Sequence, residues 1–262
     1  MEMEKKNTGP RPYILAETNW KQVKSTKYEV AVLPWGATEA HNYHLPYATD
    51  NIQNEHVAAL AAQKAWEKEC KVVVLPNVPF GLNTGQLDVD LCLNMNLSTQ
   101  IAVLKDLVDV LSRQNINKLV IMNGHGGNHF KQIIREMSFH YPDVFICAIN
   151  WFQAVDWNLY FDEPGDHAGE METSAIMHIA PELVLPLEEA GDGHAKKFKL
   201  TAFKEGWATA QRAWTKVTKD TGVGNPYAAS AHKGEKYIAA CTDNIAQLFI
   251  ELAETPLDEM YE

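Results

Sequence analysis

Short apolar runs alternate along the first 150 residues with longer segments in which apolar residues recur at helical spacing. Four apolar runs have the length of buried strands, and they are 29–34 (EVAVLP), 71–75 (KVVVL), 118–122 (KLVIM) and 144–149 (VFICAI). The helical patterns cover residue 50 or 51 to about 69, 97–114 and 128–140. This alternation predicts right-handed crossovers and a parallel sheet that helices cover on both faces. The predicted fold class is therefore α/β.

The second half of the chain is less regular. Residues 163–167 (EPGDH) are predicted to form a loop, 172–180 a helix, and 188–223 a polar excursion that carries tryptophans. A long final helix follows over about 227–254. Neither an internal repeat nor a domain linker interrupts the sequence. We therefore predict a single domain over residues 1–262, with a core of about 12–250 and short extensions at both ends.

The charge balance excludes some classes of partner. Asp and Glu number 34 against 23 Lys and Arg, which gives a formal net charge of −11 and disfavours a nucleic-acid partner.

No run approaches the roughly 18 consecutive apolar residues of a membrane span. The first residues, MEMEKKNTGPRP, lack the apolar core of a signal peptide. We therefore expect a cytoplasmic protein without a nucleic-acid or membrane partner, and the four dispersed cysteines argue against a thiolate metal site.

The segment 36–51 (GATEAHNYHLPYATDN) follows the first predicted strand and carries several side chains able to bind a metal. Ligands of parallel α/β sheets bind beyond the carboxyl ends of the strands, which is where this segment lies. Glu39 and His41 project to the same side if the backbone is extended, and Asp50 follows at the start of a helix. Carboxylate and imidazole together suit zinc, manganese or iron. The alternative is that Asp50 only caps the helix and that the histidines lie on the surface.

Two further segments carry similar chemistry. NGHGGN (123–128) follows the third predicted strand, and its glycines allow a bound group to approach the backbone closely around His125. DHAGEMETS (166–174) offers His167, Glu170 and Glu172 just before a helix. Residues two apart diverge on a helix, so only one of these two glutamates is expected to reach a metal.

Other polar and aromatic residues are given weaker assignments. Four tryptophans are candidates to wall a pocket for a flat polar substrate, although packing in the core is the commoner role of this residue; they are Trp151, Trp157, Trp207 and Trp214. His56 is left unassigned. The remaining histidines are predicted to be structural or superficial, and they are His129, His140, His178, His194 and His232.

These three segments, in this order, resemble the creatininase (creatinine amidohydrolase) family. The family signature GSTEQHGPHLPLGTD is similar to GATEAHNYHLPYATD at 36–50, NGHGGN is matched letter for letter, and HAGxxETS appears at 167–174. The stretch 222–234 (GVGNPYAASAHKG) resembles the family's GVxGDP segment. The resemblance spans about residues 12–250.

The resemblance implies a three-layer α/β/α sandwich with a mainly parallel central sheet and a binuclear divalent-metal site. Glu39, His41, Asp50 and His125 match family metal ligands, with Asp50 as the expected bridge between the ions. Creatininases proper carry a glutamate where this chain has Gly127, and Glu172 is the candidate that replaces it. His167 matches the position expected to move protons as the catalytic residue. The expected cofactors are two divalent ions, Zn²⁺ first, with Mn²⁺ or Fe²⁺ as alternatives.

The implied activity is hydrolysis of a non-peptide C–N bond, in a cyclic amide or formamide of a small polar substrate, by a metal-activated hydroxide. The loop at 80–98 departs from the family pattern, which weighs against creatinine itself as the substrate. The family also implies a homo-oligomer, a hexamer in its known members. One alternative is a protein of this fold that binds a metal or ligand without turnover. Another is a different two-metal hydrolase such as a phosphoesterase, which the absence of an evident Arg or Lys phosphate clamp near the motifs disfavours.

Overall fold

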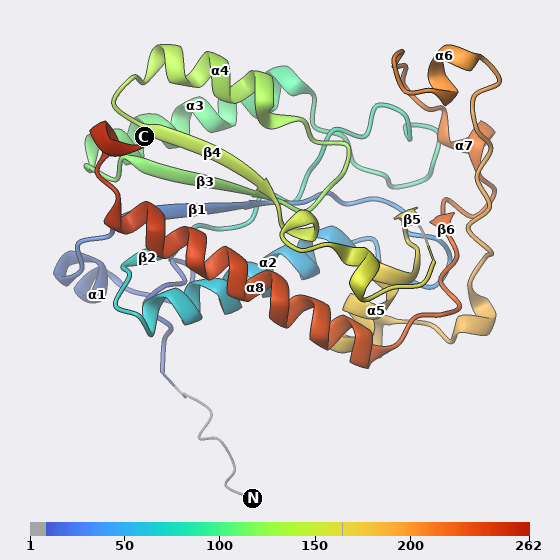
Figure 1. The fold of residues 1–262 in the computed structure, drawn as a ribbon, viewed down its shortest axis with the longest axis horizontal. Coiled ribbons are helices and arrows are strands. Elements are labelled where there is room, and N and C mark those ends of the chain that lie inside the picture. The colour runs from blue at the N-terminus through green and yellow to red at the C-terminus, as the bar shows by residue number, and fades with distance from the viewer. Residues whose placement is uncertain (1–8, 164) are drawn as a thin grey trace, which may run out of the picture.

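A computed structural model describes residues 9–163 and 165–262, and a four-stranded parallel sheet lies at its centre (Figure 1). The strand order is β2-β1-β3-β4. A separate antiparallel pair, β5-β6, lies beyond the carboxyl ends of these strands. The strands are β1 (Val30–Trp35), β2 (Val72–Val74), β3 (Lys118–Asn123), β4 (Phe145–Asn150), β5 (Gly165–His167) and β6 (Val223–Gly224).

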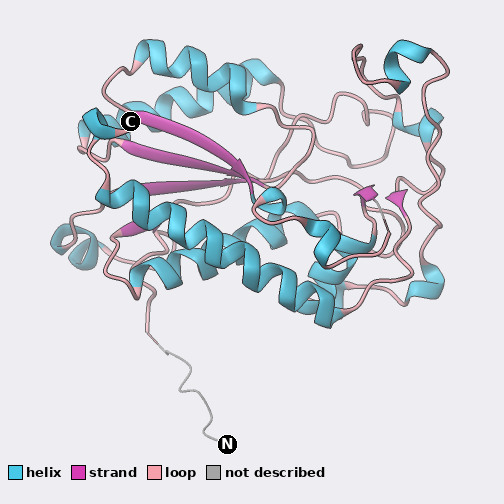
Figure 2. Cartoon of the chain, viewed as in Figure 1, coloured by secondary structure: helices cyan, strands magenta, loops and turns pink. Residues whose placement is uncertain are grey.

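Helices cover both faces of the large sheet (Figure 2). Helices α3 and α4 lie on one face, whereas α2 and α8 lie on the other together with α5 (Figure 1). The predicted α/β class with a parallel sheet between helical layers is therefore confirmed. The helices are α1 (Trp20–Ser25), α2 (Thr49–Trp66), α3 (Leu97–Arg113), α4 (Phe130–His140), α5 (Glu170–Ile179), α6 (Thr201–Lys204), α7 (Trp214–Val217) and α8 (Ala231–Glu254).

Strands β1 and β2, and β3 after Lys118, are buried along their whole length, because both of their faces are covered. Val30 and Val32 of β1 belong to the core cluster that contains α2 and α8. Ala31 and Leu33 belong to the opposite cluster, which contains α3 and α4. Successive side chains of a strand point to opposite faces, so a continuous apolar run is what a doubly covered strand requires.

The predicted elements agree with the structure to within a few residues. The largest shift is in the final helix, which begins at Ala231 because the Ser230 side chain caps it, accepting a hydrogen bond from the Lys233 backbone N–H over 3.3 Å. The small β5-β6 sheet was not predicted, since two- and three-residue strands rich in glycine leave no alternating pattern. Among the described residues, no helix is both long and apolar enough to cross a membrane.

Candidate metal centre

The segments that follow β1 and β3 meet because these two strands are neighbours. Trp35 at the end of β1 is in register with Asn123 at the end of β3. Beyond this point His125 Nδ1 lies 2.8 Å from Glu39 Oε1 and 3.2 Å from Asp50 Oδ2. All three residues are buried. The convergence at the carboxyl edge of the sheet therefore follows from strand order alone.

Asp50 lies in the first turn of α2 and turns its side chain toward the histidines. Its Oδ1 lies 3.0 Å from His41 Nε2. The N-cap residue of α2 is Ala48, and no side chain caps the helix. Since His41 is fully buried, the simpler interpretation, with Asp50 as a cap and His41 on the surface, does not hold.

Glu172, on α5, faces this cluster from the opposite side. Its Oε1 lies 3.9 Å from His41 Nε2, and its Oε2 accepts a hydrogen bond from the Ala168 backbone N–H. Ala168 has a φ of 51°, an unusual conformation for a residue with a side chain, and it aims this N–H at the carboxylate. The turn between β5 and α5 thus holds Glu172 in place.

Glu170 points elsewhere and stabilises the loop that precedes β5. It pairs with Lys233 of α8 and accepts hydrogen bonds from the backbone N–H groups of Asp162 (2.8 Å) and Glu163 (2.7 Å). Only Glu172 of the two glutamates therefore comes near the histidines.

Three groups of side chains bring their ligand atoms within 4.8 Å of one another. Asp50 belongs to two of these groups, and His167 belongs to the third. The groups are Glu39 with Asp50 and His125, His41 with Asp50 and Glu172, and Glu39 with His41 and His167. The sequence-predicted residues are thus all brought together, and Asp50 lies between the first two sets.

One ring nitrogen of His167 is held by a hydrogen bond, and the other faces the cluster. Its Nε2 lies 2.8 Å from the Ala40 carbonyl oxygen, so Nε2 carries the proton and donates. Its Nδ1 lies 3.8 Å from Glu39 Oε1 and keeps a free lone pair. The ring lies against that of His41, with the centroids 4.1 Å apart and the two planes tilted by 36°.

Burial and close charges shift the pKa values of the whole cluster. Although burial acts in the opposite direction, the carboxylates of Asp50 and Glu172 raise the pKa of His41 to about 10. Burial also acts to lower the pKa of His125, but the Glu39 and Asp50 carboxylates outweigh it and raise this pKa well above its usual value. In turn, His41 and His125 hold the pKa of Asp50 far below its usual value despite burial.

The pKa values of His167 and Glu172 shift in the directions that favour the neutral forms of these two residues. Burial, and then the charge of His41, lowers the pKa of His167 to about 4. Burial raises the pKa of Glu172 to about 7, against the attraction of His41. At neutral pH the metal-free cluster therefore contains charged His41 and His125 and a neutral His167.

Several residues that support the cluster were missed from the sequence. Gln86 donates a hydrogen bond from its side-chain amide to Glu39 Oε2, and Cys92 Sγ donates to Gln86 Oε1 over 3.3 Å. Both lie in the loop at 80–98, whose departure from the family pattern was the only signal. Asn128 Oδ1 accepts hydrogen bonds from the Leu82 backbone N–H and from Gln100 Nε2, both at 3.0 Å, and so ties this loop to the NGHGGN turn.

Two cavities reach the cluster. One, of about 250 Å³, is lined by His167, Glu172 and Trp157. The other, of about 240 Å³, is lined by Glu39, His125 and Trp214. The tryptophan prediction holds for Trp157 and Trp214, which border cavities.

The remaining predicted tryptophans and histidines lie away from the cluster or at its margin. Trp151 is buried in the core, and Trp207 is 74% exposed. His129 was assigned to the structure or surface, yet it also borders the cavity that contains Glu39. His140, His194 and His232 are exposed, as predicted.

The fold and this cluster define an α/β protein with a buried carboxylate–imidazole centre that could hold metal ions. The family described as "Creatininase: Creatinine amidohydrolase" matches residues 16–249, so the chain belongs to the creatininase family. A crystal structure from Bacteroides fragilis, provisionally named a creatinine amidohydrolase, shares 46% identity with a TM-score of 0.90, covering 96% of this chain and 99% of that one.

More distant relatives have different names. The mycofactocin precursor peptide peptidase of Mycobacterium ulcerans is 25% identical over 245 residues, covering 88% of each chain. The creatinine amidohydrolase of Pseudomonas putida is 23% identical, covering 90% of this chain and 96% of that one. Creatininase structures described as of the Zn–Zn type and as the Mn form share the fold, each with 20% identity, a TM-score of 0.76 and coverage of 93% of this chain and 99% of the other.

Proposed function

We propose that the protein is a metal-dependent amidohydrolase that cleaves the C–N bond of a cyclic amide or formamide with two divalent cations. The observation that supports this most strongly is the position of Asp50, whose two oxygens face two different sets of ligand atoms. A carboxylate shared in this way is typical of two-metal hydrolases. The family relatives named amidohydrolase and peptidase both act on amide bonds, in keeping with this reaction.

The residues present fit a pair of divalent cations. Each ligand set contains only oxygen and nitrogen donors, which suit Zn²⁺, Mn²⁺ or Fe²⁺. Asp50 Oδ2 is buried and accepts no well-formed hydrogen bond from the described residues, so it is free to bind a cation. Glu39, Asp50 and His125 would hold one ion, and His41, Asp50 and Glu172 the other. When bound, such ions lower the pKa of water toward about 7 and polarise a carbonyl.

Gly127 supports the assignment of Glu172 as a ligand. A Cβ atom at Gly127 would lie 2.4 Å from His125 Nε2, so a side chain cannot stand there with the imidazole in its present position. Glutamate at this place, as in creatininases proper, would require His125 to move. Glu172 of α5 would supply a carboxylate ligand without requiring His125 to move.

His167 is the residue that we propose moves the proton. The Ala40 carbonyl fixes its Nε2–H, and Nδ1 is left to accept a proton and pass it to the departing nitrogen. In the metal-free protein, burial and the charge of His41 lower the pKa of His167, so the ring is neutral at neutral pH, as proton acceptance requires. The Trp214 ring lies edge-on to the His167 ring, with the two ring centroids 4.9 Å apart.

Metal binding should release protons, because metal ligands must be deprotonated. His41 has a pKa of about 10 in the metal-free protein, and the pKa of His125 is also raised, so both are charged at pH 7. Glu172, with a pKa of about 7, is also about half protonated at pH 7. Adding Zn²⁺ to metal-depleted protein at pH 7 should therefore release about two and a half protons per chain, and affinity should fall as the pH is lowered. Calorimetry in buffers of different ionisation enthalpy measures this number, and His41→Gln should release about one proton fewer. Binding without proton release would contradict the ligand assignment.

A substrate screen tests the function itself. Protein loaded in turn with Zn²⁺, Mn²⁺ and Fe²⁺ should hydrolyse a member of a panel of lactams, including creatinine, or of formamides. Hydrolysis of phosphoesters alone would favour the other two-metal class. Stoichiometric metal with no turnover of any compound would favour a binding protein that lacks activity.

A further inference from the structure

Residues 195–217 form a basic segment in an otherwise acidic protein. The segment contains six cations and one carboxylate, Glu205, although the chain has a formal net charge of −11. Glu205 is engaged by Trp207, whose Nε1 donates a hydrogen bond to it over 2.9 Å. Within residues 9–163 and 165–262, Arg212 pairs with Asp166, and the five lysines form no ion pair. These are Lys196, Lys197, Lys199, Lys204 and Lys216.

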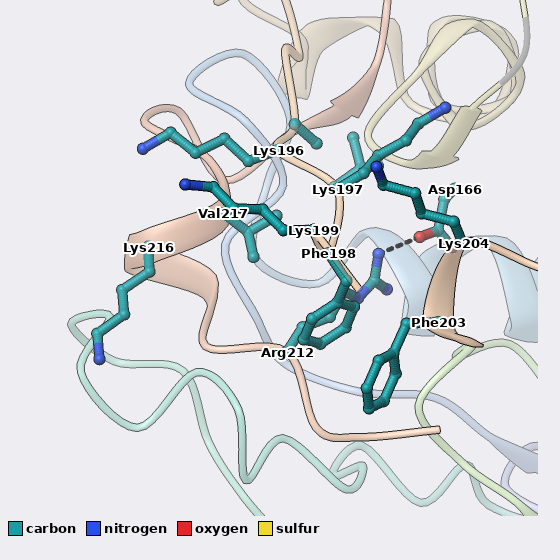
Figure 3. Close-up of a pocket in the computed structure, with 12 residues that line it drawn as sticks. Asp166, Lys196, Lys197, Phe198, Lys199, Phe203, Lys204, Arg212, Lys216 and Val217 are labelled. Carbon is teal, nitrogen blue, oxygen red and sulfur yellow. Dashed lines mark hydrogen bonds and ion pairs between the residues drawn. The ribbon is translucent and has the colours of Figure 1, made fainter. Parts of the chain in front are cut away.

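The cations line a cavity of about 630 Å³ between the segments that carry α6 and α7. Phe198 and Phe203 give it an apolar wall, with their rings stacked at a centroid distance of 4.7 Å. In Figure 3, Lys197 and Lys204 extend on the side of Asp166. Lys196 and Lys216 extend toward the other side of the cavity (Figure 3). The Asp166 side therefore combines two ammonium groups with the Arg212 guanidinium.

This cavity adjoins the candidate metal centre. Asp166 and Arg212 line both the basic cavity and the cavity that contains Glu39, His125 and His167. Arg212 Cζ lies 4.9 Å from the centroid of the Trp214 ring, which in turn contacts His167. A molecule whose amide lies beside His167 can thus extend its far end toward the lysines.

The charge pattern favours an anion in this position. Cations gathered around a concave surface repel one another and focus a positive potential into it. The carboxylate-rich centre and the negative net charge would otherwise keep an anionic molecule away. A carboxylate or phosphate group relieves the repulsion and forms strong hydrogen bonds with ammonium and guanidinium groups.

We propose that the basic cavity is the subsite for a carboxylate or phosphate group of the substrate, held by Lys197, Lys204 and Arg212. The proposal rests on the amidohydrolase function above and makes it more specific: the substrate is an anionic amide whose charged group is remote from the bond that is cleaved. The aromatic wall of Phe198 and Phe203 then packs against the part between the two groups.

Anion binding can be measured without catalysis. Metal-depleted protein is titrated by calorimetry with inorganic phosphate and, separately, with glutarate. The anion that binds more tightly shows whether the subsite prefers a phosphate or a carboxylate group. The double variant K197Q/K204Q should weaken binding of that anion about tenfold or more. The matched control K24Q/K105Q removes two exposed helical lysines far from the cavity in sequence and should bind as the wild type does.

Substrate selectivity is then measured with metal-loaded protein. One pair of probes differs in charge at a position remote from the formamide bond: 4-formamidobutyrate and its carboxamide. We expect the wild type to prefer the acid to its carboxamide in kcat/KM. In K197Q/K204Q the kcat/KM for the acid should fall about tenfold or more, mainly through KM, so that the preference for the acid over its carboxamide is lost.

The outcomes separate the two proposals. Absent anion binding, or binding that the double variant retains, overturns the subsite even if amides are hydrolysed. Variant-sensitive anion binding without hydrolysis of any amide supports an anion site and overturns the amidohydrolase function. A change of oligomeric state in K197Q/K204Q with unaltered anion binding would assign the lysines to an interface between copies and overturn the subsite.

Discussion

Asp50→Ala is expected to abolish binding of both metal ions and to reduce hydrolysis by at least about a thousandfold. The reason is that Asp50 contributes to both ligand sets, so its loss removes an anionic donor from each ion at once. It also leaves His41 and His125 without the carboxylate between them. Metal content measured by elemental analysis after dialysis, together with the rate on the best substrate of the screen, tests this expectation.

Two further variants make the result specific. Asp50→Asn keeps the shape of the side chain and should also lose both ions, which separates the missing charge from a folding defect. Glu170→Gln removes a carboxylate that is equally buried but is directed to Lys233, and it should keep both ions. Stoichiometric binding of two ions by Asp50→Ala would show that Asp50 is not the shared ligand.

His167→Ala should retain both metal ions and lose about 10²- to 10⁴-fold in kcat, the usual contribution of a positioned proton carrier. Its imidazole is buried beside Glu39 with Nδ1 free, and no other neutral imidazole belongs to the three ligand groups. Steady-state kinetics with parallel metal analysis measures both quantities.

His167→Gln provides the matched variant for this role. Its amide N–H can still donate to the Ala40 carbonyl, yet it cannot carry a proton, so turnover should remain low. Full activity in either variant would refute proton transfer by His167. Loss of an ion from His167→Ala would instead identify it as a ligand, as its membership of the third group allows.

Much of the fold was predictable because the central strands are buried on both faces. A short apolar run such as KLVIM, followed by a glycine-containing turn, is typical of a strand in a covered parallel sheet, and β3 forms there with an added residue, Asn123. The β5-β6 pair was not predictable, because its partners are separated by more than fifty residues and its register depends on contacts between loops.

The candidate site was predictable where motifs follow strands and unpredictable where loops fold back over it. Glu39 and His125 approach one another because β1 and β3 are adjacent. Gln86 and Arg212 reach the site from irregular segments whose path no local pattern specifies. For the same reason the sequence does not show that Arg212 lies against Asp166 in the folded chain.

Anomalous diffraction from crystals soaked in Zn²⁺ or Mn²⁺ is the most direct test of the central claim. The account predicts two peaks per chain, with Asp50 about 2.0–2.2 Å from both ions. Glu39 and His125 should complete one ion's protein ligands, and His41 and Glu172 those of the other. A map without peaks among these residues, or with Glu172 turned away from both ions, would contradict it.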